Sequence, residues 1–220
     1  MPEPAGVLRL LAWLSPAFPT GGYAYSHGIE WAVDRREITD GATLHDWVHA
    51  VLTHGAGRSD AILLRHAHRA AHDPAALADL AELALATAPS RERLLETVGQ
   101  GNAFLAAARP WQPDALLPPA ADIAYPVAVG ALAGAAGIDE DTACAGVLQA
   151  FAANLISAAV RLVPLGQSAG LAVLARLEPT VRAVAAETRG AGLDDLGGAC
   201  FRSDLAAMRH ETQYTRLFRS

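Results

Sequence analysis

The sequence predicts an all-α protein, a single-domain helical bundle with a flexible C-terminal tail. Apolar residues recur at the three- and four-residue spacing of a helix, as at Leu8, Leu11 and Ala12, and alternating strand-like runs are missing. The chain has 220 residues, of which 52% are hydrophobic and 18% charged. Such a chain can bury one core, so residues 1–220 are predicted to form one domain, with about 190–220 as hinge and tail.

The expected helices of the first half begin and end at recognisable residues. The first stops at Pro16, and a second is expected from Tyr23 to Arg35, after the Gly21-Gly22 pair. Asp, Ser and Thr side chains before a helix can accept hydrogen bonds from its free N–H groups, and proline fits the first turn. On these signals helices are expected from Asp40 or Thr43 to about Gly55, from Ser59 or Asp60 to about His72, from Asp73-Pro74 onward, and from Ser90 through Arg109.

The second half opens with a proline-rich connection. The interval from Pro110 to Pro126 holds five prolines and is expected to be a loop within the domain. Three helices are then expected: about Pro126–Ala136, Glu140–Leu162 and Gln167–Arg189, the last broken before Pro179. The glycines at 190, 192, 197 and 198 predict a flexible joint before the tail.

One stretch has the length of a membrane span. The chain carries no charge between Asp141 and Arg161, yet this stretch is rich in alanine and contains Gln149, Asn154 and Ser157. Such residues insert poorly into lipid but suit a buried bundle helix or a subunit interface. We therefore expect no membrane insertion.

Charge and cysteine usage narrow the function further. The net charge of −6 argues against non-specific nucleic-acid binding. All 17 basic residues are arginine, so no lysine is present for a Schiff base or a Walker motif. Cys144 and Cys200 stand among small apolar neighbours and are expected to be reduced and buried, which fits a cytoplasmic protein.

Two functional hypotheses for the region from Gly21 to Gly28, a catalytic serine and a phosphate-binding loop, are disfavoured. Ala24–Gly28 fits A-x-S-x-G, but a nucleophile elbow needs a preceding strand, and adjacent Ser26 and His27 would point about 100° apart on a helix. The glycine pair could cradle phosphate, but the complete phosphate-binding motifs are missing.

A metal-dependent hydrolase is the alternative hypothesis for the function of this protein. In His45-Asp46-Trp47-Val48-His49 the two histidines are four residues apart and share one helical face, as zinc ligands do. No third ligand follows at a suitable spacing, and His66, His68 and His72 form only a looser set. Surface histidines are the favoured interpretation of both groups.

The C-terminal segment is locally basic. From Arg202 onward it has four arginines and two acids, and Tyr214, Leu217 and Phe218 would form a short apolar stripe on a helix. Aromatic residues and arginines dominate binding hot spots, so this segment could be an interface. A terminal helix packed on its own bundle, or a frayed end, remains equally open.

Two long motifs resemble those of the urease accessory protein UreF family. They are S-P-A-F-P-T-G-G-Y-A-Y-S-H-G-I-E at 15–30 and M-R-H-E-T-Q-Y-T-R-L-F-R-S at 208–220, and the resemblance also covers the middle of the chain around Gly99-Gln100-Gly101. It implies an all-α homodimer that is not an enzyme and has no cofactor of its own. Its implied partners are the accessory protein UreD (also called UreH), the nickel-carrying GTPase UreG and apo-urease, into which the assembly loads nickel.

The resemblance also implies which residues bind partners. In this family the tail helices tend to become ordered when the second accessory protein docks, and Tyr23 and Arg216 are the foremost candidates for the contact surface. The full predicted set is Tyr23, Ser26, His27, Glu30, Arg209, His210, Glu211, Tyr214, Arg216 and Arg219. We expect both motifs to be exposed at the surface.

Overall fold

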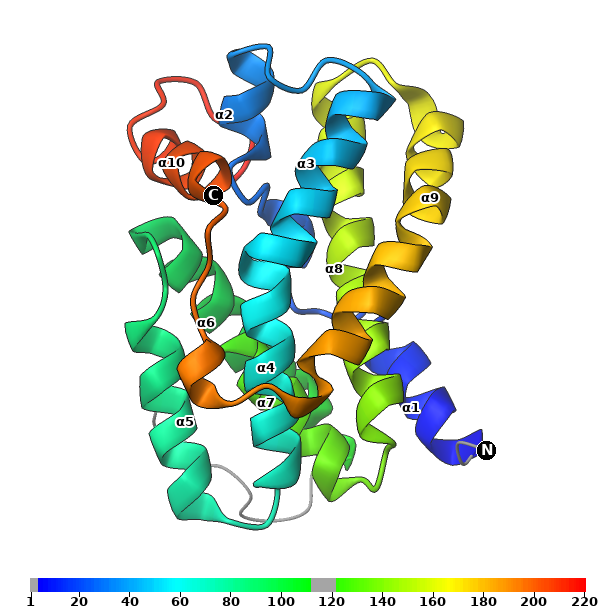
Figure 1. The fold of residues 1–220 in the computed structure, drawn as a ribbon, viewed down its shortest axis with the longest axis vertical. Coiled ribbons are helices and arrows are strands. Elements are labelled where there is room, and N and C mark those ends of the chain that lie inside the picture. The colour runs from blue at the N-terminus through cyan, green and yellow to red at the C-terminus, as the bar shows by residue number, and fades with distance from the viewer. Residues whose placement is uncertain (1–3, 112–121) are drawn as a thin grey trace.

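The computed structural model describes residues 4–111 and 122–220, and within these ranges every regular element is a helix (Figure 1). The predicted all-α class is confirmed, while part of the proline-rich interval from Pro110 to Pro126 lies outside the described residues. The α-helices are α1 (Pro4–Trp13), α2 (Ile29–Asp34), α3 (Gly41–His54), α4 (Ala56–Arg69), α5 (Pro74–Ala86), α6 (Arg91–Ala108), α7 (Tyr125–Ala135), α8 (Glu140–Leu162), α9 (Gly166–Glu187) and α10 (Phe201–His210).

Three of the predicted capping residues start their helices as expected, but Ser59 and Asp60 do not, because α4 begins at Ala56, directly after Gly55. Asp40 accepts hydrogen bonds from the amides of Ala42 and Thr43 at 3.0 and 2.8 Å, and Asp73 and Ser90 cap α5 and α6 in the same way. Each cap satisfies N–H groups that have no partner within the first turn.

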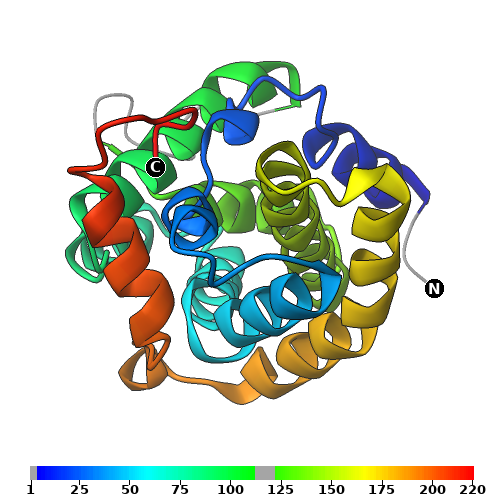
Figure 2. The same ribbon diagram turned by 90° about the horizontal axis from the view of Figure 1, so that it is seen from above.

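Helices α4 and α7 pack closely at the centre of the bundle. A Cβ atom built on Gly130 would lie 2.3 Å from the carbonyl oxygen of Leu64, and one on Gly134 would lie 2.3 Å from that of His68. Only glycine allows the two backbones to come this close. Helices α3, α8 and α9 lie on one side of this pair, and α5 and α6 on the other (Figures 1 and 2).

By length and composition alone, α8 could cross a membrane. Its apolar window has a mean hydropathy of 1.7, but half of that window is buried inside the fold, where α8 packs on α9, α4, α2 and α3. This packing is that of a core helix in a bundle, as the sequence predicts.

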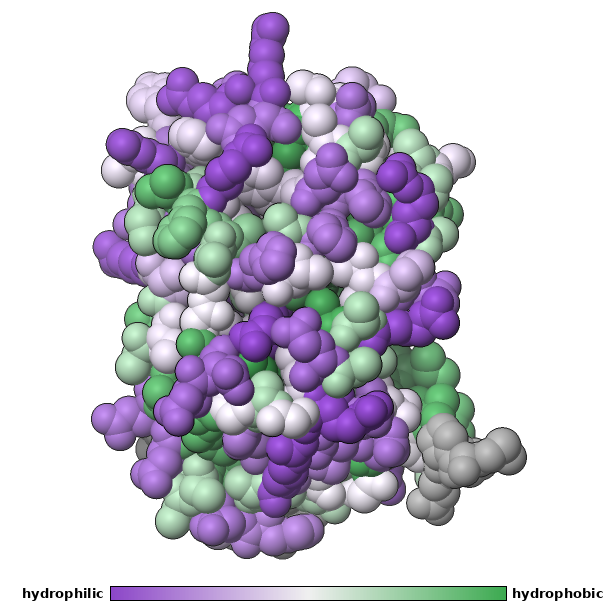
Figure 3. All heavy atoms as spheres, viewed as in Figure 1, coloured by the Kyte–Doolittle hydropathy of each residue, from purple (hydrophilic) through white to green (hydrophobic). Residues whose placement is uncertain are grey.

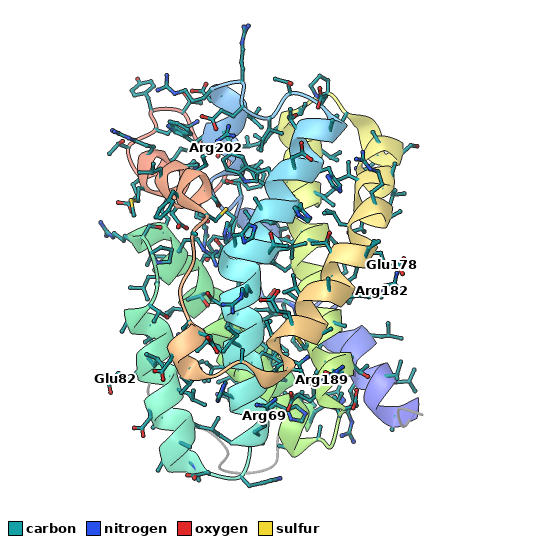
Figure 4. The ribbon with its side chains drawn as sticks, in the orientation of Figure 1. Arg69, Glu82, Glu178, Arg182, Arg189 and Arg202 are labelled. Carbon is teal, nitrogen blue, oxygen red and sulfur yellow. The ribbon has the colours of Figure 1, made fainter. Side chains whose placement is uncertain are left out.

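Ion pairs join α4, α8 and the 3₁₀ turn Thr188–Gly190, which directly follows α9, at the end of the bundle opposite the tail. The buried guanidinium of Arg65 donates to Glu140 at 2.5 Å and to Asp141 at 2.8 Å. Arg69 and Arg189, which lie close together in Figure 4, add bonds of 2.7 Å to the same two carboxylates. Shared partners of this kind hold these three elements in register.

The expected helix from Tyr23 to Arg35 is wrong in its first half. A short 3₁₀ turn covers Gly22–Ala24, Tyr25 is extended, and His27 and Gly28 have positive φ angles of 57° and 79° before α2 begins. This backbone forms only short turn bonds with itself, such as the Tyr25 amide to the Gly22 carbonyl, and the Ala24 carbonyl and the Ser26 amide bond instead to the end of the chain. A contact that distant overrides local periodicity.

Two expectations about the C-terminal half are also wrong. Helix α9 continues through Pro179, where both the proline and Ala175, whose carbonyl loses its helical partner, are exposed to solvent. The stripe of Tyr214, Leu217 and Phe218 does not form, since α10 ends at His210 and Phe218 turns into the core while the other two stay exposed.

Candidate functional site

The two motifs from opposite ends of the sequence lie against each other. The amide of Arg219 donates to the carbonyl of Ala24 at 2.8 Å, and that of Ser26 donates to the carbonyl of Ser220 at 2.6 Å. The Ser26 hydroxyl donates to the same Ser220 oxygen at 2.5 Å. We call residues 24–30 and 210–220 together the terminal junction; Figure 2 shows the tail running beside the segment that leads into α2.

Glu30 connects the two halves of the terminal junction. Its carboxylate, buried in the first turn of α2, accepts hydrogen bonds from the amides of Leu217 and Phe218 at 2.6 and 2.9 Å. It also faces Nε2 of His210 at 2.9 Å. One side chain therefore satisfies three donors from the tail, which is the condition for burying a carboxylate.

His210 is a fully buried imidazole between two carboxylates. Its Nδ1 lies 2.8 Å from Glu92 and its Nε2 lies 2.9 Å from Glu30. Burial opposes the charged form, but the hydrogen bonds to Glu92 and Glu30 outweigh it and raise the pKa of His210. Both nitrogens face acceptors, so the group held here is an imidazolium that donates twice.

A second buried ion pair supports the terminal junction from α6. Glu96 pairs with Arg93 one turn away and accepts a hydrogen bond of 3.1 Å from the hydroxyl of Ser220. Burial opposes ionisation of Glu96, but the Arg93 charge outweighs it and lowers the pKa of Glu96 to about 2. Beside it, burial and the Arg93 charge lower the pKa of His27, whose ring packs edge-on against Phe151.

The outer side of the terminal junction is aromatic and basic. Tyr214 is fully exposed, Leu217 is 71% exposed and Tyr23 is 70% exposed beside the paired backbones. The arginines at 209, 216 and 219 are exposed as well, and Glu211 is half-buried. Arg216 also reaches back to Glu92 at 3.2 Å, so its guanidinium lies at the edge of the buried cluster.

Helix α10 adds an apolar face that sequence reasoning missed. Phe201, Leu205 and Met208 are all exposed, and their spacing places them on one side of the helix. Figure 3 shows apolar side chains gathered over α10 among polar ones. The i, i+4, i+7 spacing of these three residues is the signal in the sequence that could have revealed this face.

Four of the ten predicted contact residues are not at the surface. Ser26, His27, Glu30 and His210 are buried in the terminal junction, so the expectation that both motifs are exposed throughout is wrong for them. Their polar groups are used to join the two ends of the chain. The other six, at 23, 209, 211, 214, 216 and 219, are exposed or half-buried.

A partly open pocket of about 500 Å³ lies next to the terminal junction. Trp13, Phe18 and Phe151 line its apolar wall, and Asp60 and Arg93 line its polar part. Burial raises the pKa of Asp60 to about 6, against the attraction of the Arg93 charge. An acid of this kind can take up or release a proton near neutral pH.

The histidine pair that suggested a hydrolase has other contacts. The rings of His45 and His49 stack at 6.0 Å, while Asp46 and the Thr180 hydroxyl occupy their Nδ1 atoms at 3.1 and 3.0 Å. In the part of the chain that the structure describes, no three His, Cys, Asp or Glu side chains are grouped to hold a metal ion. A zinc hydrolase needs such a set, so the geometry does not support this alternative.

The geometry equally disfavours a serine nucleophile. Ser26 is fully buried and its hydroxyl is bonded to the backbone of Ser220, and no strand delivers it to a turn. An elbow serine must instead be exposed at the top of a sheet.

Comparison with known proteins identifies the family. The UreF family profile matches residues 38–178. A urease accessory protein UreF of Rhodopseudomonas palustris is 52% identical over 225 aligned residues, covering 99% of this chain and 94% of that protein. Those of Methylorubrum populi and Xanthobacter autotrophicus are each 53% identical, covering 97% and 99% of this chain and 98% and 92% of theirs.

Both motifs of the terminal junction lie outside the matched range 38–178, yet the full-length relatives cover nearly all of this chain. The resemblance seen in the two motifs is therefore confirmed. The chain belongs to the UreF family of urease accessory proteins, and it is an accessory protein rather than an enzyme.

Proposed function

We propose that this protein scaffolds a maturation complex with the accessory protein UreD (UreH) and the GTPase UreG, and modulates that nickel-carrying GTPase while nickel is inserted into apo-urease. It acts in the cytoplasm, as a homodimer and a single domain. Nickel is handled by the complex, and this chain needs no cofactor of its own. Membership of the UreF family supports the role in urease maturation.

One observation carries the assignment of a binding surface. Residues from both ends of the sequence meet in the terminal junction, whose outer side carries Tyr23, Tyr214 and exposed arginines. Tyrosine and arginine are hot-spot residues, because they bury a large area and can bond at the same time. Ordered backbone beneath them reduces the entropy lost on binding.

The chemistry of this surface favours a particular partner surface. The apolar face of α10 lies next to Arg202 and Arg209, both of them exposed. A helix of this type fits an apolar groove whose rim carries carboxylates, since arginine forks bind carboxylates in pairs. We assign this face to UreD (UreH) and the Tyr23 and Arg216 region to UreG.

Scaffolding is the simpler route by which the protein influences GTP hydrolysis. An arginine supplied in trans can accelerate such hydrolysis, and Arg216 or Arg219 could act so. Arg216 is already bonded to Glu92, which suits a positioning role. If hydrolysis by UreG is unchanged after both arginines are replaced, a catalytic arginine is excluded.

The binding surface is tested by co-purification of UreG with the UreD-bound protein. Tyr23→Ala and Arg216→Ala are expected to weaken capture by about 30-fold, the equivalent of a hot spot of about 2 kcal/mol. Arg182→Ala is the matched control, because Arg182 is an exposed arginine on α9 that pairs with the exposed Glu178 on the same helix (Figure 4). Normal capture of UreG by both junction variants would refute this assignment.

A further inference from the structure

We propose that Glu30, Glu92 and His210 are positioning residues for partner binding: a buried charge clamp that sets the shape of the tail without touching a partner. This inference rests on the proposed function, because the tail side chains that it positions are the proposed contacts. It explains what Glu30 and His210, the two motif residues in the clamp, contribute to binding although they are buried and cannot contact a partner themselves.

Glu30 closes a loop in the tail. It bonds His210 at one end of the loop and the amides of Leu217 and Phe218 at the other. Residues 211–216, which carry Tyr214 and Arg216, lie between these two attachments. The position of the loop therefore depends on a carboxylate that lies in α2, 180 residues before His210.

Glu92 attaches the same loop to α6. It bonds Nδ1 of His210 at 2.8 Å and Arg216 at 3.2 Å, so both ends of the segment 210–216 also meet a second carboxylate. The clamp thus joins α2, α6, α10 and the tail. Removing any one of its three members leaves a buried partner unsatisfied.

The clamp requires a protonated histidine. An imidazolium has two N–H donors on opposite sides of one ring, whereas the neutral ring has one and would turn a lone pair toward a carboxylate. With the proton, the two carboxylates are balanced by His210 and Arg216. Without it, the buried cluster carries one uncompensated negative charge, which low-dielectric surroundings penalise.

The neighbouring charges do not replace that proton. On α6, the Arg93 charge is paired with Glu96, and burial and the Arg93 charge lower the pKa of His27 beside them, which disfavours its charged form. In the first turn of α10, burial raises the pKa of Asp204, although the Arg93 charge favours the ionised form of this carboxyl. The balance at the clamp therefore depends on His210 itself.

The sign of the pH effect follows from this arrangement. The pKa of His210 is raised in the folded protein, so its contribution is complete below the ordinary value of 6.5 and is lost as pH rises through the folded value. Alkaline conditions should release the tail while the rest of the bundle stays folded. A merely structural tail contact would not show this profile.

The experiment measures hydrogen exchange of the Leu217 and Phe218 amides in the full chain from about pH 6 to about pH 10, corrected for intrinsic exchange, with the core amide of Leu64 as reference. In the wild type we expect protection of the two tail amides to fall at least about tenfold over this range, while Leu64 is unaffected. In His210→Gln protection should be low at every pH, and binding of UreG to the UreD-bound protein should weaken in parallel.

Tyr214→Ala separates this inference from the proposed function. Tyr214 is exposed and lies outside the clamp. Its replacement should therefore weaken the binding of UreG, but should leave the exchange protection of the tail amides and the pH dependence of that protection unchanged. If Tyr214→Ala binds normally while the clamp behaves as described, the contact surface is wrong and the clamp stands. A flat wild-type profile at Leu217 and Phe218, or unchanged protection in His210→Gln, overturns the clamp.

Discussion

Gly28 is the position where a single methyl group should disturb the terminal junction most. Its φ is +79°, a left-handed conformation, and a Cβ atom there would lie 2.8 Å from the amide nitrogen of Ala207 and 3.0 Å from the Cβ of Ala206. Gly28→Ala therefore has two costs. The left-handed backbone costs about 1–2 kcal/mol, and forcing α10 away costs a further 1–3 kcal/mol or so.

Gly21→Ala is the matched control for the first cost. Gly21 has a similar φ of +73°, but nothing lies within 4 Å of the Cβ that it would gain. It should lose only about 1–2 kcal/mol of stability. The difference between the two variants, about 1–3 kcal/mol, measures the contact between Gly28 and α10.

The assay is urea denaturation followed by helical circular dichroism, with both variants and the wild type at the same pH. Gly28→Ala should have the lower midpoint and, because α10 must move, should also bind UreD more weakly. Equal loss of stability in the two variants would show that α10 does not lie against Gly28 as the structure has it, and the reasoning on the terminal junction would fail.

Three further predictions test other parts of the fold. Asp60→Asn should raise stability at pH 7 by up to about 3 kcal/mol, since the folded pKa of about 6 exceeds the ordinary 3.8, so that the cost of ionisation builds up between these two pH values and is complete above the folded pKa; a gain of the same size at about pH 3.5 would contradict this. Gly130→Ala should lower the free energy of unfolding by at least about 1–3 kcal/mol in urea denaturation, because its Cβ would meet the Leu64 carbonyl, whereas Gly190→Ala, with open space around it, should be neutral. After dialysis, zinc content measured by atomic emission should be far below stoichiometric and the same in His45→Ala; stoichiometric zinc that the variant loses would revive the hydrolase alternative.

Local chemistry made much of the fold predictable. Asp40, Asp73 and Ser90 start helices because their side chains accept hydrogen bonds from amides two or three residues later. Both partners are close together in the sequence, so this interaction can be predicted without the fold. The three- and four-residue spacing of apolar side chains likewise predicts the bundle helices. Family membership was also predictable, because the two end motifs are long and specific.

Local rules failed where distant backbone or solvent decided the outcome. The break between Tyr23 and α2 arises because Ser26 bonds to Ser220, and no helical pattern contains that partner. Helix α9 continues through Pro179 because the interrupted turn is exposed to water, which depends on how the helix faces the bundle.

The sequence by itself determined the helical class, the side-chain caps of α3, α5 and α6, and membership of the UreF family. Only the tertiary structure decided which residues of the two motifs are buried and which are exposed. His210 and Tyr214 stand four residues apart, yet one is enclosed by carboxylates of α2 and α6 and the other is fully exposed. The physical reason is that a buried charge must be matched by opposite charges, and here folding brings those from positions more than a hundred residues away.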